Sequence, residues 1–237
     1  MSFKKSLAVA TVALLAAPTL AAAETSPLYI TLGAGLSILE DSDLSGGGST
    51  VSAQSNNPGW ALMGAVGVGV FDSVRTELEL AHRRNSIDNL SGEFNATSIM
   101  ANVLYDVPVK FGIFSPYIGA GIGAARIDAE NIRTTPFGLV DDEDWTWAYQ
   151  GIVGIAGDIA NNWKVTLDYR YFSTFNDPDF GSSSGTKVEG EYTDHTIMLG
   201  FRYSFGPAAS SAPMAQPAAA PAPAPAPSPA PSASPMV

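Results

Sequence analysis

The residues best suited to nucleophilic catalysis are two histidines on different segments, His82 and His195. Ser86 and Asp88 follow His82 closely, and a hydroxyl, an imidazole and a carboxylate can together form a catalytic set. No recognisable motif surrounds them, and Arg83 beside His82 is more typical of a polar residue at an interface. We therefore expect no catalytic residues in this chain.

Acidic residues are a second group with chemical potential, because carboxylate oxygens are ligands that Ca²⁺ prefers. They are the run Asp141-Asp142-Glu143-Asp144 and the residues Asp177, Asp179, Glu189, Glu191 and Asp194. We favour solvated acidic loops over a metal site. The sequence has no cysteine, and its two separated histidines argue against zinc. We expect neither a metal nor a cofactor.

Charged residues also alternate with apolar ones along two segments. The first set is Arg75, Glu77, Glu79 and Arg83, and the second is Lys164, Asp168 and Arg170. Successive side chains of a strand point to opposite faces, so each set lies on one face of a strand. Side chains of opposite charge on one buried face can pair with one another.

The elements that carry these residues are eight segments in which apolar residues recur with a period of two. They are 28–37, 60–70, 74–84, 99–107, 116–126, 147–157, 163–171 and 197–205. About ten residues is the length that a tilted strand needs to cross a bilayer. Short connections at 71–73, 108–115 and 160–162 alternate with expected loops at 38–58, 85–96, 128–144 and 173–192. This asymmetry is typical of hairpins in outer-membrane barrels.

The residues on the other face distinguish a transmembrane barrel from a soluble one of the lipocalin type. On the first, second and fifth segments this face is mostly Gly and Ala, which would make a poor solvated surface. The apolar face carries aromatic residues near strand ends, as a bilayer interface selects. These are Trp60, Tyr105, Trp147, Trp163, Tyr169, Tyr171, Tyr203 and Phe205. We therefore predict an all-β fold, an eight-stranded antiparallel up-and-down transmembrane β-barrel with its apolar face outward.

The inward face then combines small residues with charges. The predicted lumen charge network is Arg75, Glu77, Glu79, Arg83, Asp106, Lys164, Asp168, Arg170 and Arg202, beside Gly33, Gly35, Gly67, Gly69, Gly119, Gly121 and Gly123. Nearly balanced charges favour internal ion pairs, and an eight-stranded barrel is just wide enough for its own side chains to fill it. A plugged core is therefore the favoured interpretation. A narrow polar path gated by the ion pairs is the alternative.

The two ends of the chain suggest processing and a tether. Lys4 and Lys5, the apolar stretch 7–17 and the small residues 21–23 predict a secretory signal peptide over 1–23. The barrel domain would span 24–206, followed over 207–237 by a disordered Pro/Ala-rich tail on the periplasmic side. Without Lys4 and Lys5 the chain has a formal charge of −13, which argues against a nucleic-acid partner.

Three runs stand in order on the fifth, seventh and eighth segments: PYIGAGIG at 116–123, LDYRYF at 167–172 and LGFRYSF at 199–205. Together they resemble the OmpA-like β-barrel superfamily, and more closely small bacterial porin-family and surface-antigen proteins. The resemblance covers residues 26 to 206. It implies a place in the bacterial outer membrane, among outer-membrane lipid and lipopolysaccharide, with the long loops extracellular. It also implies that Gly200, Tyr203 and Phe205 form the signal that the β-barrel assembly machinery reads.

Two departures from that pattern matter. Met198 stands where the terminal signal usually begins with a polar residue. In OmpA itself a similar hinge leads to a peptidoglycan-binding domain, whereas this sequence ends at Val237 without one. We therefore expect no cell-wall anchoring beyond weak contact between the tail and peptidoglycan.

These observations favour a structural, surface-exposed outer-membrane barrel that contributes to envelope integrity or surface recognition. A small, low-conductance porin is the alternative, and a lipid A-modifying enzyme is a more distant one. The acidic loops could also bridge divalent cations to lipopolysaccharide. The sequence names no ligand for these loops.

Overall fold

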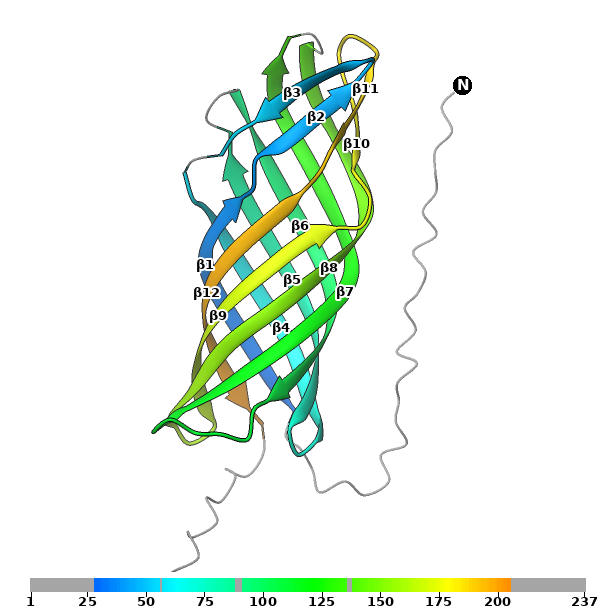
Figure 1. Cartoon of the computed structure of the whole chain (residues 1–237). Coiled ribbons are helices and arrows are strands. Elements are labelled where there is room, and N and C mark those ends of the chain that lie inside the picture. The colour runs from blue at the N-terminus through cyan, green and yellow to red at the C-terminus, as the bar shows by residue number, and fades with distance from the viewer. Residues whose placement is uncertain (1–27, 56, 88–90, 136–137, 206–237) are drawn as a thin grey trace, which may run out of the picture. The chain divides into compact units, whose positions relative to one another are not determined.

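The computed structural model describes residues 28–55, 57–87, 91–135 and 138–205 (Figure 1). The predicted signal peptide over 1–23 and the predicted tail over 207–237 lie outside these ranges, and both stay predictions. Within the described residues, no helix has the length and apolar character needed to cross a membrane.

Eight strands close into an antiparallel barrel (Figure 1). They are β1 (Tyr29–Leu39), β4 (Gly59–Phe71), β5 (Val74–Ser86), β6 (Ser91–Asp106), β7 (Phe114–Thr134), β8 (Gly138–Ala160), β9 (Trp163–Thr174) and β12 (Thr193–Ser204). Each pairs with the barrel strands before and after it, and β1 pairs with β12 from Tyr29 opposite Ser204 to Leu39 opposite Asp194. The predicted eight-stranded up-and-down barrel is confirmed.

The two ends of the barrel differ. The connections β4–β5, β6–β7 and β8–β9 are short, and we call this the short-turn end. The opposite end, which we call the cap end, carries a second sheet with the strand order β10-β11-β2-β3, drawn at the top of Figure 1. Its strands are β2 (Ser42–Gly46), β3 (Ser49–Ala53), β10 (Asp179–Gly181) and β11 (Lys187–Gly190). The expectation of plain loops at 38–58 and 173–192 is therefore wrong.

The expected loops at 128–144 and 85–96 are corrected as well. Strands β7 and β8 stay paired past this region, with Thr134 opposite Gly138. Strand β5 runs to Ser86, which pairs with Glu93 on β6. Since both hairpins extend beyond the predicted strand ends, the cap end is a folded continuation of the barrel.

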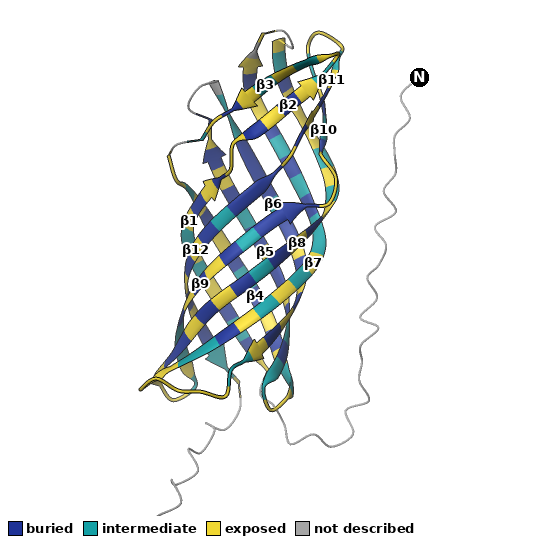
Figure 2. Ribbon diagram, in the orientation of Figure 1, coloured by how far each residue is buried: buried dark blue, intermediate teal, exposed yellow. Residues whose placement is uncertain are grey.

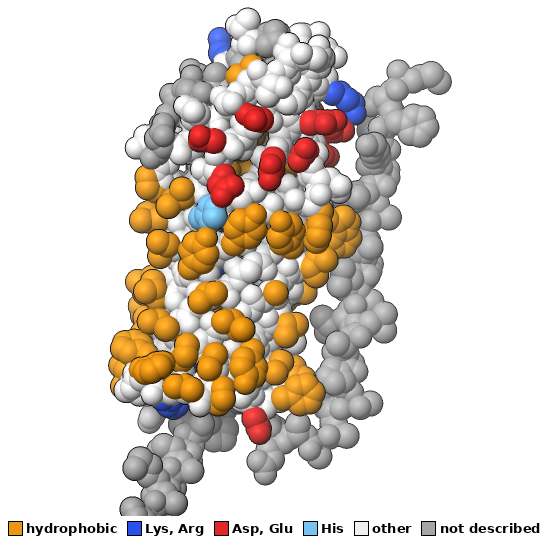
Figure 3. All heavy atoms as spheres, in the orientation of Figure 1, with side chains coloured by type: hydrophobic (Ala, Val, Ile, Leu, Met, Phe, Trp, Pro, Cys, Tyr) orange, Lys and Arg blue, Asp and Glu red, His pale blue; other side chains and the backbone are white. Residues whose placement is uncertain are grey.

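The outward face of the barrel is apolar over a broad belt. Leu32, Val103 and Val153 are more than half exposed on it, and exposed and buried residues alternate along each strand (Figure 2). Rings of Trp60, Trp147 and Trp163 are exposed on the same surface. Figure 3 shows this hydrophobic belt with acidic side chains directly above it, toward the cap end. The predicted orientation, apolar face outward, is confirmed.

Near the cap end the polarity of the two faces is reversed. On β7 the outward residues change from Ile118 and Ile122 to Arg126 and Asp128, while the inward residue Ile127 is fully buried. The inward apolar residues pack with side chains of the cap sheet into one cluster, which we call the apolar plug. Its members are Leu39, Leu44, Ala53, Ile87, Phe94, Ala96, Met100, Ala125, Ile127, Ala129, Ile132, Val140, Ala148, Phe172, Phe180, Val188 and Tyr192.

Candidate functional site

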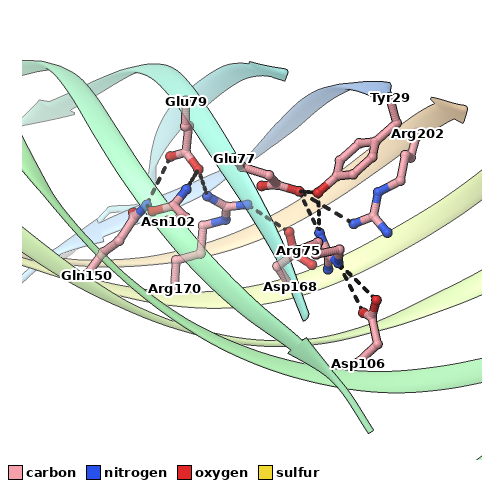
Figure 4. A network of polar contacts seen from close by, with 10 residues as sticks. All are labelled: Tyr29, Arg75, Glu77, Glu79, Asn102, Asp106, Gln150, Asp168, Arg170 and Arg202. Carbon is pink, nitrogen blue, oxygen red and sulfur yellow. Dashed lines mark hydrogen bonds and ion pairs between the residues drawn. The ribbon is translucent and has the colours of Figure 1, made fainter. Parts of the chain in front are cut away.

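The lumen nearest the short-turn end holds two arginines between two tyrosine rings. Arg75 on β5 lies 4.7 Å from the ring centre of Tyr117, and Arg202 on β12 lies 4.9 Å from that of Tyr29. Glu77 accepts a hydrogen bond from the Tyr29 hydroxyl at 2.8 Å and pairs with Arg75 at 2.5 Å (Figure 4). The guanidinium charges are thus stabilised both by carboxylates and by aromatic faces.

The two arginines, the two tyrosines and the carboxylates paired with the arginines form the tyrosine cluster. Arg75 also pairs with Asp106 on β6 at 3.1 Å, and Arg202 lies 3.9 Å from Glu77. The cluster comprises Tyr29, Arg75, Glu77, Asp106, Tyr117 and Arg202. It contains two cations and two carboxylates, so its charges balance.

A second set, the Glu79 cluster, lies beside it and crosses the lumen. Arg170 on β9 pairs with Glu79 on β5 at 2.5 Å and with Asp168 at 3.0 Å (Figure 4). Asn102 donates to Glu79 at 2.9 Å, and Gln150 donates to Asn102 at 2.7 Å. Because β5 and β9 are not neighbours in the sheet, this ion pair links opposite walls of the barrel.

Closer to the cap end, Arg83 pairs with Asp194 on β12 at 3.4 Å, and both side chains are fully buried. The guanidinium lies 4.3 Å from the ring centre of Phe172, which belongs to the apolar plug. Ser37 and Thr196 donate hydrogen bonds to the Asp194 carboxylate. The expectation that Asp194 lies in an outer loop is wrong, since it is inside the barrel.

Burial raises the pKa of the neighbouring Tyr192 phenol far above its ordinary value, and the Asp194 carboxylate adds to the shift. The phenol therefore stays neutral over the physiological pH range.

Of the nine predicted network residues, seven lie in the tyrosine and Glu79 clusters and Arg83 lies in the pair above them. The ninth, Lys164, is placed elsewhere. Its ammonium group pairs at 2.6 Å with Asp158, and both side chains are partly exposed near the β8–β9 turn. In the alternation along β9, Lys164 falls on the inward side. It lies only one residue from the strand end, however, where its long side chain can reach the rim of the barrel. The network expectation for Lys164 is therefore corrected.

Sequence reasoning missed Tyr29, Asn102, Tyr117, Gln150 and Asp194 as members of these clusters. Each is buried and lies on the inward face of its strand. Applying the alternation to the tyrosines and the amide side chains would have found four of them, and extending the last strand back to Thr193 would have found Asp194.

The lumen side chains leave no room for a water column at this level. Glu79, Arg83, Arg170 and Asp194 are at most 2% exposed. A side chain that lines a water-filled channel would be accessible to water, so this burial describes a packed core. Taken together, the ion pairs of these groups join β5, β6, β9 and β12. Hydrogen bonds of Tyr29 and Gln150 and the ring contact of Tyr117 add β1, β8 and β7.

Two cross-strand pairs show how the glycines fit this packing. Tyr29 lies opposite Gly67, and Tyr117 lies opposite Gly154. A Cβ atom on Gly67 would lie 2.3 Å from the Tyr29 ring, and one on Gly154 would lie 2.6 Å from the Tyr117 ring. Glycine at these positions leaves room for each ring against the neighbouring strand.

The residues of the predicted assembly signal lie at the end of the last strand. The rings of Tyr203 and Phe205 are 5.0 Å apart, and Tyr203 also contacts Trp163 at 4.9 Å. Gly200 lies where a Cβ atom would be 2.5 Å from Thr166 Oγ1. The role of Gly200, Tyr203 and Phe205 in assembly stays a prediction.

The two histidines face outward on different strands. His82 contacts Thr97 at 2.9 Å and Trp60 through its ring. His195 contacts Glu40 and Tyr169, each at 2.6 Å. Since β4 and β1 separate β5 from β12, the structure does not bring the two histidines together. Ser86 is exposed at the end of β5, and Asp88 lies outside the described residues.

Three acidic residues of the run 141–144 have protein partners. Asp142 accepts the backbone N–H of Gly181 at 2.8 Å, and Asp144 accepts that of Asp179 at 3.1 Å. Glu143 pairs with Arg126. Among the described residues, no three side chains of the types His, Asp or Glu gather as a metal site. The run therefore joins β8 to β10.

Comparison with known sequences decides the family. The sequence model of the outer membrane protein beta-barrel domain matches residues 7–205. The chain belongs to this outer membrane β-barrel family. It is accordingly a protein of the bacterial outer membrane, surrounded by lipid and lipopolysaccharide.

Relatives of this outer membrane barrel are distant. An outer membrane protein of Gluconacetobacter diazotrophicus is 29% identical over 243 residues, covering 84% of this chain and 63% of the relative. An uncharacterized protein of Brucella abortus strain 2308 is 27% identical over 161 residues, covering 55% of this chain and 56% of the relative. The chain thus spans less than two thirds of the length of both relatives.

Solved barrels share the fold. Neisserial surface protein A superposes with a TM-score of 0.51 at 16% identity, over 75% of this chain and 97% of that protein. OprG of Pseudomonas aeruginosa gives 0.50 at 15% identity, over 76% and 97%. AlkL gives 0.50 at 20% identity, over 81% and 97%. At these identities the likeness concerns the fold alone.

Proposed function

We propose that this outer membrane barrel is a structural protein with a closed lumen that displays a folded, acidic cap at the cell surface. The observation that carries the proposal is the layered filling of the lumen. The tyrosine cluster, the Glu79 cluster, the Arg83–Asp194 pair and the apolar plug follow one another from the short-turn end to the cap end. Such a core supports a role in envelope integrity or surface recognition.

The proposed orientation has the short-turn end in the periplasm and the cap end outside the cell. Short turns on the periplasmic side and longer outer connections are the usual arrangement of outer-membrane barrels. A leader over 1–23 would leave the start of β1, which lies at the short-turn end, on the periplasmic side.

The cap end carries the chemistry available for recognition. Its acidic residues are Glu40, Asp41, Asp43, Glu93, Asp128, Glu130, Asp141, Asp142, Glu143, Asp144, Asp177, Asp179, Glu189 and Glu191. Basic residues there are few, and Arg84, Arg126 and Lys187 are already paired with acids. The cap therefore attracts cationic groups rather than anionic ones.

Thiol labelling tests the display of the cap, because the chain has no native cysteine. Thr50→Cys on β3 and Asn161→Cys in the β8–β9 turn each introduce a single exposed thiol. We expect a membrane-impermeant maleimide to label position 50 on intact cells, and position 161 only after the outer membrane is permeabilised. Labelling of position 161 alone on intact cells would overturn the orientation.

A deletion strain separates the structural role from the porin alternative. We expect the strain to become more sensitive to detergents while the uptake of small hydrophilic solutes stays unchanged. Slower solute uptake with unchanged detergent sensitivity would favour the small porin instead.

A further inference from the structure

The β6–β7 turn at the short-turn end is unusually apolar. Phe111 is 69% exposed and Phe114 is 41% exposed, and Val109 and Ile113 are exposed as well. Phe71, the last residue of β4 beside the neighbouring β4–β5 turn, is also exposed. Exposed apolar side chains that gather in this way mark a surface that contacts something other than water.

The turn has a defined backbone. Phe111 donates to the carbonyl of Phe114 at 2.8 Å, and Phe114 donates back at 3.1 Å. Gly112, between them, has a φ of 65°, which favours glycine. The amide of Asp158 on β8 also donates to the carbonyl of Ile113 at 3.2 Å. These bonds fix the backbone of the turn and tie it to β8.

The apolar surface of the turn is continuous with the lipid-facing belt. A Cβ atom on Gly157 of β8 would lie 2.9 Å from Phe114 Cε1 and 3.5 Å from Val165 Cγ1. The Phe114 ring therefore lies over the outward face of β8, beside Val165. Exposed Ile155 and Ile159 lie on the same face of that strand.

Positive charge borders this surface. Lys110 in the turn is 3.9 Å from Asp158, whose other carboxylate oxygen lies 2.6 Å from Lys164. Two ammonium groups thus share one carboxylate, and the Lys110 side chain is largely exposed. In the described residues these are the two lysines of the short-turn end. Aromatic residues with a neighbouring cation match the boundary between acyl chains and phosphate headgroups.

We propose that the β6–β7 turn is an interfacial anchor: its apolar tip inserts among the phospholipids of the adjacent leaflet, and Lys110 binds their phosphates. On the orientation proposed above, this is the inner leaflet of the outer membrane. The anchor fixes the depth and tilt of the barrel at the β6–β8 side. Lys164 and Asp158, which stand apart from the lumen network, set the charge of its rim.

Site-directed spin labelling tests the anchor in the full mature chain. Phe111→Cys and, as the control in a turn at the same end, Asn161→Cys are labelled with a nitroxide and reconstituted into phosphatidylethanolamine/phosphatidylglycerol vesicles. We expect the ratio of collision with oxygen to collision with a water-soluble nickel complex to be several-fold higher at 111 than at 161. Equal ratios at the two positions would overturn the proposal.

Two further readouts keep the interpretation specific. A label at 111 that is shielded from both oxygen and nickel would show a protein occupant, either the tail or a second copy, and would also overturn it. Lys110→Gln should lower the depth at 111 when phosphatidylglycerol is present. The depth measurement does not depend on which leaflet is contacted, so it is independent of the labelling test in cells.

Discussion

Individual side chains in the lumen are held in place by pairing with one another. Arg170 is fully enclosed and receives two carboxylates, Glu79 and Asp168, at hydrogen-bonding distance. A guanidinium group is suited to this position because its planar donors can serve two carboxylates at once. Loss of either partner leaves a charge that the barrel wall cannot solvate.

Glu79→Ala should therefore destabilise the barrel strongly. Removing one partner of a buried ion pair costs about 3–5 kcal/mol. We expect a large fall in the urea midpoint of the refolded protein in detergent. Glu189→Ala, which removes an exposed carboxylate on β11, is the control and should leave the midpoint unchanged.

The triple variant Glu79→Met/Asp168→Asn/Arg170→Met tests the cause, because it removes the arginine together with both of its carboxylates and keeps comparable volume. It should recover most of the stability lost in Glu79→Ala. A single variant as stable as the parent protein would show that the ion pair carries no weight.

Among single residues, the sequence could predict charges but not all their partners. Parity along the strands placed Arg75, Glu77 and Glu79 on the inward face before any coordinates. It could not distinguish Lys164 from them, because a long side chain near a strand end can turn to the rim. It also could not identify which pairs meet across the lumen, since β5 and β9 are distant in the sheet.

At the scale of elements, the face of the strand that carries the apolar residues changes along the barrel wall. A barrel wall in lipid is apolar outside, whereas the same wall in water is apolar inside. On β7 the apolar residues face outward at Ile122 and inward at Ile127. On β8 they face outward at Tyr149 and inward at Val140. A strand read from the sequence as one unbroken alternation of apolar and polar residues ends where the apolar residues change face. The regions beyond it were therefore expected to be loops, although they are paired strands.

The cap sheet is joined to the barrel by carboxylate side chains of β8 that accept hydrogen bonds from backbone N–H groups of β10. Asp142→Ala removes the acceptor for the Gly181 amide at the edge of β8. We expect faster hydrogen exchange at β10 and a loss of about 1 kcal/mol in local stability. Asp141→Ala is the matched neighbour, exposed on the same strand, and should leave β10 exchange unchanged. Equal exchange in both variants would refute this role for Asp142.

Close approach between strands gives another prediction. A Cβ atom on Gly123 of β7 would lie 2.0 Å from the carbonyl oxygen of Ile99, whereas one on Gly151 of β8 would meet nothing within 4 Å. Gly123→Ala should cost about 1–3 kcal/mol, because the β6 backbone must move. Gly151→Ala should be neutral. The measurement is the urea midpoint of unfolding of each variant in the same detergent. Indistinguishable midpoints would contradict the role of close strand approach at Gly123.

At the scale of the whole molecule, two different cores close one barrel. Ion pairs and tyrosine rings fill the lumen toward the short-turn end, and the apolar plug fills it toward the cap end. The ring centre of Phe94 of the barrel lies 6.2 Å from that of Phe180 of the cap sheet and 6.4 Å from that of Tyr192. The cap is thus packed on the barrel by its own hydrophobic core, which a mobile loop would not provide.

The closed lumen is the central claim, and single-channel conductance tests it most directly. The mature protein would be refolded, its folding checked by whether boiling changes its gel mobility, and then inserted into a planar bilayer. We predict no discrete openings from folded wild-type protein, because both polar clusters and the apolar plug interrupt any water path. Steady, discrete openings from the same folded sample would contradict the claim and make the lumen ion pairs the gate of a small porin.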